Sequence, residues 1–383
     1  MTNEIQLLLY CASTQIYARR TEKIHQLLQQ ELDWQYLLTT AQEHGVMPLL
    51  YWQLKSADSK LVPTEAWQQL SAAFNTNACH NLALTSELCK LQELFTSQNI
   101  LFLSFKGSVL AKLAYQNIAL RQFVDIDILI YESDLKAASE LLINNGYQPQ
   151  FSFTEKQQEK YLEIRSEHNF FHPNKEITID LHWSILPKHF SFSPEQKLVW
   201  SQQKTVSFGK TTVKTMSPEI TILFLCAHAA KHNWNHLCWI VDIAEILNNN
   251  PELDWDFIQT HQGYLGTEQM FNLSLYLAHD LLNAHLPQPI WQQIKLDTDI
   301  LVLAKEVKAI LFENKSYYIG SFPVANIYLK TMNFWQDKVW YWLDAIATPT
   351  PLEWSIVSLP TWLFPLYYPI RLIRLFFKSS FSI

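Results

Sequence analysis

The amino-acid sequence predicts an α+β protein, in which a small mixed β-sheet is flanked by an N-terminal and a C-terminal helical region. Apolar residues recur at three- and four-residue steps through residues 1–98 and again through residues 216–345, which is typical of helices with one buried face. Residues 99–215 instead combine short apolar runs of strand length with helical segments. These three regions are the expected domains, and residues 346–383 form a tail rich in proline and aromatic residues.

Length and composition allow a large buried core and argue against several classes of protein. The chain has 383 residues, of which 48% are hydrophobic and 17% charged, so wholesale disorder is not expected. Neither a G-x-G-x-x-G fingerprint nor a Walker motif is present, which argues against the usual dinucleotide and P-loop folds. The five cysteines are odd in number and widely spaced, which indicates a reducing cytoplasm rather than a disulfide framework.

The N-terminal region is predicted to be helical throughout. Asp33 begins a helix that ends near Gly45, and Pro63 occupies the first turn of a long helix that reaches about Ser97. Asn77 and Asn81 interrupt the apolar pattern of this long helix, and solvated or capping roles are expected for both.

The central region contains the most informative stretch of the chain. Residues 100–105 form an apolar run short enough for a buried strand, and Lys106-Gly107-Ser108 ends it before a helical pattern begins. A second strand-like run holds Asp125-Ile126-Asp127, followed by three apolar residues. Because side chains alternate along a strand, Asp125 and Asp127 are expected to point to the same face.

This stretch offers a metal site and a phosphate site side by side. Two neighbouring carboxylates repel each other unless a cation lies between them. Mg²⁺ suits such a pair, because proteins bind it through one or two carboxylates plus substrate phosphates. Gly107 and Ser108 lie at a strand-to-helix turn, where backbone N–H groups can hold a phosphate.

A third acidic residue completes a pattern that resembles a known superfamily. The Gly-Ser turn, the Asp-x-Asp strand and a later carboxylate are similar to the signature of the DNA polymerase beta-like nucleotidyltransferases. Asp180 supplies the later carboxylate, within the strand-like run of residues 177–183, and a hairpin turn at Pro173-Asn174 would bring this strand to the sheet. Within the superfamily, Phe105-Lys106-Gly107, Arg121 and Asp180-Leu181-His182-Trp183 resemble a bacterial branch known as the uncharacterised nucleotidyltransferase family.

The resemblance implies a small nucleotidyltransferase palm that uses two Mg²⁺ ions and a nucleoside triphosphate, with ATP as the expected nucleotide. It implies that Asp125 and Asp127 hold Mg²⁺ on the triphosphate. Asp180 would share the second ion and help to deprotonate the acceptor. The groups expected to bind the nucleotide's phosphates are Lys106, Gly107, Ser108, Arg121 and Lys231.

The C-terminal helical region is predicted to begin at Ser217, an N-cap, with Pro218 at the first helical position. His228 and His232 follow four residues apart, a spacing that can hold a metal, yet no H-E-x-x-H motif is present. The resemblance assigns this segment to nucleotide binding through Lys231 instead. The roles of these two histidines and of His182 stay open.

The expected reaction moves a nucleoside monophosphate to a hydroxyl or amine of a small molecule or a protein, with release of pyrophosphate. Two alternatives stay open, namely a toxin that modifies tRNA ends and a catalytically inactive nucleotide-binding regulatory module. The net charge of −7 argues against nucleic acid as a partner, because general nucleic-acid binders usually present a basic face, although a local basic patch stays open. We expect a cytoplasmic protein, and the tail of residues 346–383 packs either on the body or on the inner membrane face.

Overall fold

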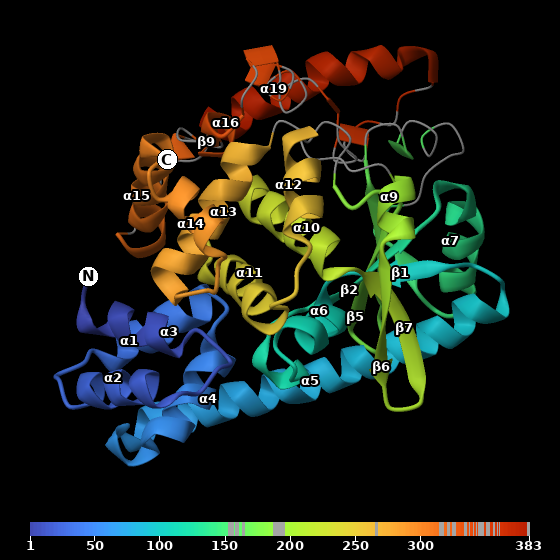
Figure 1. The fold of residues 1–383 in the computed structure, drawn as a ribbon. Coiled ribbons are helices and arrows are strands. Elements are labelled where there is room, and N and C mark those ends of the chain that lie inside the picture. Colours follow the sequence, from blue (N-terminus) through green and yellow to red (C-terminus); the bar gives the residue numbers. More distant parts are fainter. Residues whose placement is uncertain are drawn as a thin grey trace.

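The computed structural model describes residues 1–151, 157, 161–162, 165–186, 196–264, 267–313, 318–319, 322–323 and 327–332. Beyond these it describes residues 335–336, 338–339, 341, 343, 348–349, 353–354, 357, 359 and 361–380. Much of the predicted tail therefore lies outside the described residues. Figure 1 shows a helical part beside a small sheet, with one long helix running beneath both.

The N-terminal region is entirely helical, as predicted. Its elements are α1 (Asn3–Cys11), α2 (Ala18–Leu28), α3 (Trp34–Glu43), α4 (Met47–Ala57), η1 (Ser59–Leu61) and α5 (Thr64–Ser97). The predicted long helix is α5, and Pro63 lies at its N-cap, one position before the expected one. Asn77 and Asn81 donate hydrogen bonds to backbone carbonyls of residues 118–121, so they hold a loop in place rather than facing solvent.

The central sheet has five strands in the order β1-β2-β5-β4-β3 and is mixed, as predicted. Its strands are β1 (Phe102–Ser104), β2 (Asp125–Ile130), β3 (Gln148–Pro149), β4 (Glu167–His172) and β5 (Ile177–His182). β2 and β5 are parallel, whereas the other neighbouring strands are antiparallel. The predicted turn after His172 joins β4 to β5 and brings Asp180 next to β2.

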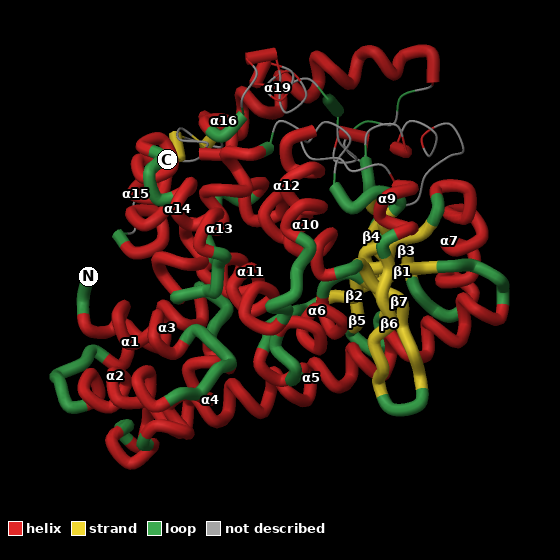
Figure 2. The backbone as a smooth tube through the Cα atoms, in the orientation of Figure 1, coloured by secondary structure: helices red, strands yellow, loops and turns green. Residues whose placement is uncertain are grey.

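Short helices complete the α/β region around the sheet. They are α6 (Gly107–Ala114), η2 (Ile118–Leu120), η3 (Glu132–Asp134), α7 (Leu135–Asn144) and α9 (Gln196–Ser201). A separate hairpin of β6 (Gln203–Phe208) and β7 (Thr211–Met216) follows, and Figure 2 shows it in yellow beside the main sheet.

The two faces of β2 meet different surroundings, because the side chains of a strand alternate. Ile126 and Ile128 belong to a core cluster that includes Leu84 and Leu88 of α5. Leu129 belongs to a second cluster on the opposite face. Asp125 and Asp127 share that opposite face, so the helix beneath the sheet does not cover them.

The C-terminal region is largely helical, as predicted, apart from a short pair of strands within residues 318–323 that was not predicted from the sequence. Its first helices are α10 (Pro218–Lys231), α11 (Leu237–Asn249), α12 (Trp255–Tyr264), α13 (Glu268–Leu282), α14 (Gln288–Ile294) and α15 (Thr298–Phe312). The Ser217 side chain caps α10, as expected. Asn233 and Trp234 have left-handed backbone and separate α10 from α11. Trp234 is fully buried, and its indole N–H donates to Ser274 at 2.9 Å, which offsets the backbone strain.

Helices of the N-terminal and C-terminal helical regions share one hydrophobic core. Leu7 and Leu8 of α1 belong to the same cluster as Ile240 of α11 and Leu273 of α13. Glu245 of α11 strengthens this junction, since it accepts hydrogen bonds from the backbone and the hydroxyl of Thr14. The helical regions of residues 1–98 and 216–345 therefore pack around one core. The predicted domain boundaries stay predictions.

The remaining described elements are β8 (Tyr318–Ile319), β9 (Phe322–Pro323), α16 (Ile327–Lys330), η4 (Thr361–Leu366) and α19 (Tyr367–Ser380). Glu353 is completely buried and accepts a hydrogen bond from Arg374 of α19 at 2.5 Å. Both residues belong to the tail, and the tail is joined to the body by Trp354 and Tyr367, which are part of the core cluster that includes Ile126 and Ile128. Among the described residues, no helix has both the length and the apolar character needed to cross a membrane.

Candidate active site and metal centre

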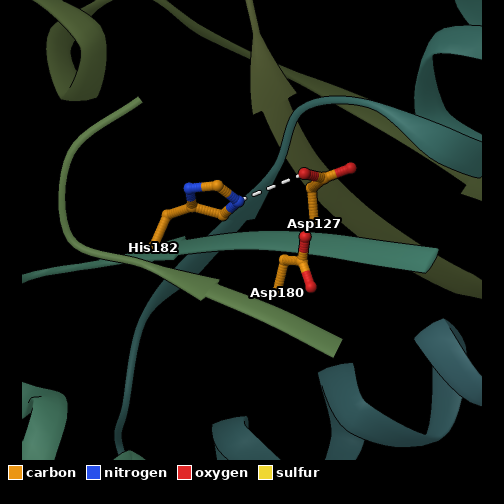
Figure 3. Close-up of side chains that lie close together, drawn as sticks. All are labelled: Asp127, Asp180 and His182. Carbon is orange, nitrogen blue, oxygen red and sulfur yellow. Dashed lines mark hydrogen bonds and ion pairs between the residues drawn. The ribbon is translucent and has the colours of Figure 1, made fainter. Parts of the chain in front are cut away.

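The register of the sheet brings the acidic residues together. Asp127 of β2 lies directly opposite Asp180 of β5, and His182 follows two residues later on the same face. Donor atoms of Asp127, Asp180 and His182 all lie within 4.8 Å of one another. Figure 3 shows the three side chains side by side. The predicted carboxylates Asp127 and Asp180 are thus neighbours, and His182 joins them.

Asp127 is the most buried and the most strongly paired of the acidic residues. It is 1% exposed, and its Oδ1 accepts from Lys106 Nζ at 2.8 Å and lies 3.1 Å from His182 Nε2. Burial alone would raise its pKa, but Lys106 and His182 outweigh burial and hold the pKa well below its usual range. Its second oxygen, Oδ2, has no hydrogen-bond partner among the residues that the structure describes. The carboxylate is therefore ionised and keeps one oxygen for a further ligand.

Asp125 begins β2 at the rim of this cluster. Burial, followed by the charges of Asp127 and Asp180, raises its pKa to about 7 against the opposing effect of Lys106. Such repulsion is the signature expected of carboxylates that await a cation. Asp125 lies opposite Thr178 rather than Asp180, which explains why it is outside the closest group of three.

Asp180 is oriented by the next strand of the sheet. Asn169 of β4 lies opposite it and donates a side-chain hydrogen bond to its Oδ1 at 2.5 Å. Burial, followed by the charge of Asp127, raises the pKa of Asp180. A carboxylate whose pKa is raised binds a proton more readily, which suits the predicted role in deprotonating an acceptor.

Sequence reasoning missed Glu167, the residue of β4 that lies opposite His182. Its Oε2 is 3.3 Å from Nδ1 of His182, whereas Nε2 of the same ring faces Asp127. His182 is 2% exposed and therefore lies between two carboxylates. The structure turns over residues 173–176, which places Glu167 opposite His182, whereas a two-residue turn at Pro173-Asn174 would place Glu167 opposite Asp180.

The predicted phosphate turn begins α6, as expected. Gly107 has a φ of +50°, and a Cβ atom there would lie 3.3 Å from the backbone oxygen of Asp125. Ser108 is 4% exposed, and its hydroxyl is hydrogen-bonded to Thr85 of α5 at 2.8 Å. The Ser108 hydroxyl therefore has an internal partner, the residue at the N-cap is Lys106, and the contact of Ser108 with a phosphate stays a prediction.

We expect Gly107→Ala to destabilise the protein by about 1–3 kcal/mol, because a left-handed residue gains a Cβ against a fixed carbonyl. Gly209→Ala is a matched control, since Gly209 has a φ of +62° but nothing lies within 4 Å of its Cβ position. Urea unfolding of both variants separates the cost of the backbone angle from that of the contact. Equal losses of stability would show that the contact with Asp125 has no effect.

Arg121 forms an ion pair with Asp242, a buried residue of α11. Its Nε and Nη2 donate to the two oxygens of Asp242 at 2.8 and 2.9 Å, and Tyr115 donates to the same carboxylate at 2.7 Å. The side chains of Arg121 and Asp242 are 13% and 2% exposed. Arg121 still lies close enough to Asp125 to lower the pKa of that carboxyl. Its predicted contact with phosphates stays a prediction, and its position is set by α11.

Lys231, at the end of α10, lies at the edge of the site. Its side chain is exposed at the surface. Partial loss of hydration lowers its pKa, while the nearby charges of Glu167 and Asp127 raise it and that of Lys106 lowers it. The lysine therefore lies within the field of the acidic cluster, as its predicted role in neutralising phosphate charge requires.

His228 and His232 form an aromatic cluster rather than a metal site. His232 stacks on Trp239 with ring centroids 4.6 Å apart and lies 4.9 Å from the ring of His228. Among the described residues, one group of three or more ligating side chains comes together, and it contains neither histidine. A metal site at His228 and His232 therefore lacks a third ligand among the described residues.

Acid should destabilise the protein partly through His232. Burial, followed by the charge of Lys231, lowers the pKa of His232 to about 4, below the value near 6.5 of an unfolded chain. The unfolded state then binds more protons, so stability falls as the pH drops from about 6.5 to about 4. We expect His232→Gln to reduce this loss by about 1–2 kcal/mol, discounted for partial exposure. Unfolding curves across this pH range, with the exposed His285→Gln as control, test the expectation, and parallel curves for wild type and His232→Gln would contradict it.

Comparison with known proteins agrees with this geometry. A family described as "Uncharacterised nucleotidyltransferase" matches residues 30–283, which cover about two thirds of the chain and all the residues of the site. No curated protein matches the chain. The matched region includes the Gly107 turn, the β2 carboxylates, Asp180 and α10. The chain therefore belongs to the uncharacterised nucleotidyltransferase family.

Proposed function

We propose that this protein transfers a nucleoside monophosphate from a nucleoside triphosphate to a hydroxyl or amine of a small molecule or a protein, with release of pyrophosphate. The observation that carries the proposal is the pairing of Asp127 with Asp180 beside the turn of Gly107. Family membership supports nucleotidyl transfer in general. The proposal also names the class of acceptor, Mg²⁺ as the metal ion and ATP as the nucleotide.

The residues at the site fit a divalent cation. Asp127 is ionised, is nine-tenths buried or more, and has an unpaired oxygen, which is costly unless a ligand meets it. Asp125 and Asp180 add two carboxylates whose pKa values are raised first by burial and then by the negative charge of their neighbours. Bound ions would neutralise the charge that develops on the attacking and leaving oxygens.

The protein's own groups would orient the reactants. The N-terminus of α6 offers backbone N–H groups to the triphosphate, and the left-handed Gly107 lets the backbone approach closely. Lys106 and Lys231 offset phosphate charge from two different elements. Asn169 holds one oxygen of Asp180, which leaves the other for the acceptor's proton or for an ion.

Incubation with each labelled nucleoside triphosphate, a divalent ion and separate pools of metabolites, proteins and tRNA would test this function. We expect pyrophosphate release and label on a metabolite or protein, both absent with Asp127→Asn. Label on tRNA would favour the tRNA-modifying alternative. Tight nucleotide binding without release of pyrophosphate in any pool would favour the inactive regulatory module. The cytoplasmic location and the membrane contact of the tail are further proposals.

A further inference from the structure

We propose that His182 is a metal ligand, and that this nitrogen makes the site bind a divalent transition ion such as Mn²⁺ more tightly than Mg²⁺. The inference rests on the metal site of the proposed function and goes beyond it by naming the ion. The aspartates alone predict Mg²⁺, since carboxylates and water are its usual ligands. An imidazole beside two carboxylates changes that preference, because an imidazole nitrogen binds first-row transition ions, Mn²⁺ included, more strongly than it binds Mg²⁺.

The distances suit a shared ion. Ligand bonds of about 2.1–2.2 Å at a right angle place two donor atoms about 3.0–3.1 Å apart, and donors on opposite sides about 4.3 Å apart. Nε2 of His182 lies 3.1 Å from Oδ1 of Asp127, and the donor atoms of the three residues all fall within 4.8 Å. Oδ1 of Asp127 is held by Lys106, so an ion here would take Oδ2 of the same carboxylate beside Nε2 of His182 and an oxygen of Asp180.

Glu167 supplies the support that a ligating histidine usually has. Metal-bound imidazoles donate their second N–H to a carboxylate or a carbonyl, which fixes the ring and strengthens the ligand. Nδ1 of His182 lies 3.3 Å from Oε2 of Glu167, on the side of the ring away from Asp127, and has no hydrogen-bond partner among the described residues. Glu167 is thus the carboxylate within reach of this nitrogen, although no hydrogen bond joins the two in the structure. The edge of the His182 ring also packs against Phe105, with centroids 5.0 Å apart, so the ring is held on a second side.

Burial makes the arrangement more than a surface cluster of acidic groups. Asp127 and His182 are 1% and 2% exposed, and Oδ2 of Asp127 is unpaired among the described residues. Lys106 donates to the other oxygen, Oδ1, which leaves Oδ2 for an ion. A simpler role for His182, a hydrogen bond that only orients Asp127, would affect Mg²⁺ and Mn²⁺ alike. Selectivity between the two ions therefore separates the two roles.

The test measures metal binding to the full-length protein without nucleotide. Mn²⁺ affinity is obtained by electron paramagnetic resonance, and Mg²⁺ affinity by its competition. We expect Mn²⁺ to bind at least about tenfold more tightly, and His182→Gln to abolish that difference by weakening Mn²⁺. Glutamine keeps a donor near the position of Nε2 but has no imidazole lone pair. Glu167→Gln should weaken Mn²⁺ about tenfold, as loss of a supporting carboxylate does.

Two further measurements keep the result unambiguous. Pulsed electron paramagnetic resonance of bound Mn²⁺ should show coupling to an imidazole nitrogen in the wild type and none in His182→Gln. His168→Gln is the matched control, because His168 lies on the opposite face of β4 and should leave both affinities unchanged. Absence of nitrogen coupling, an unchanged Mn²⁺ preference in His182→Gln, or no binding of Mn²⁺ would each overturn the proposal.

The outcome is independent of the proposed reaction. Nucleotidyl transfer with equal affinities for Mg²⁺ and Mn²⁺ would refute the role of His182 and leave the function standing. Nitrogen-coupled Mn²⁺ without transfer to any acceptor pool would refute the function and support the metal site.

Discussion

Asp125→Asn and Asp127→Asn should each reduce nucleotidyl transfer about a thousandfold or more, yet they should change the stability of the metal-free protein in opposite directions. The loss of activity follows because each carboxylate is expected to hold an ion that stabilises charge by about 4 kcal/mol in the transition state. The difference in stability follows from their surroundings. Asp127 is paired with Lys106 and His182, whereas Asp125 is repelled by Asp127 and Asp180.

The difference in stability between the wild type and Asp125→Asn should depend on pH. The folded-state pKa of Asp125 is raised to about 7, so the folded protein binds a proton that the unfolded chain has released. Wild-type stability should therefore fall as the pH rises from about 4 to about 7. Asparagine removes this loss, and we expect Asp125→Asn to be about 1 kcal/mol more stable at pH 8, with little difference at pH 4.

The Asp127 variant should lose stability at neutral pH. Asparagine removes the negative charge that Lys106 and His182 meet, and the cost is expected to be about 2–4 kcal/mol. Urea unfolding in the presence of a chelator measures all the variants, with the exposed Asp256→Asn as control. Destabilisation of both active-site variants by the same amount would contradict the unequal pairing, and transfer at the wild-type rate by either would remove that carboxylate from the metal site.

Asp242→Ala should be among the most destabilising single substitutions, at about 3–5 kcal/mol. It would leave the guanidinium of Arg121 buried without its partner, and it would also remove the acceptor of Tyr115. Tyr115→Phe should cost only about 1–2 kcal/mol, because it removes one hydrogen bond. Urea unfolding measures the free energy of unfolding of both variants. A decrease below about 1 kcal/mol for Asp242→Ala would show that the ion pair is not needed for folding.

A double variant separates the structural role of Arg121 from its predicted role in binding phosphate. Replacing a buried ion pair by apolar residues of similar size is often close to neutral for stability. Arg121→Met combined with Asp242→Leu should therefore regain much of the stability lost by Asp242→Ala. If Arg121 also contacts phosphates, the folded double variant should bind the nucleotide more weakly. Unchanged nucleotide affinity would confine Arg121 to a structural role.

Much of the site could be predicted because its residues belong to short local patterns. The strand of Asp125 and Asp127, the break at Gly107 and the hairpin before Asp180 each follow from alternation and turn chemistry. The parallel pairing of β2 with β5 then brings Asp127 and Asp180 together. A prediction of Glu167 was within reach through the same hairpin, but only after the register of the turn is specified.

The sequence by itself determined the α+β class, the helical regions on either side of the sheet, and the strands and turn that carry the acidic residues. Only the tertiary structure decided how these residues are paired. Asp242 binds Arg121 across 121 positions, Ser108 turns toward α5, and His182 lies between Asp127 and Glu167. The physical reason is that periodicity reports which face of an element is buried, whereas the partner on that face depends on how separate elements pack.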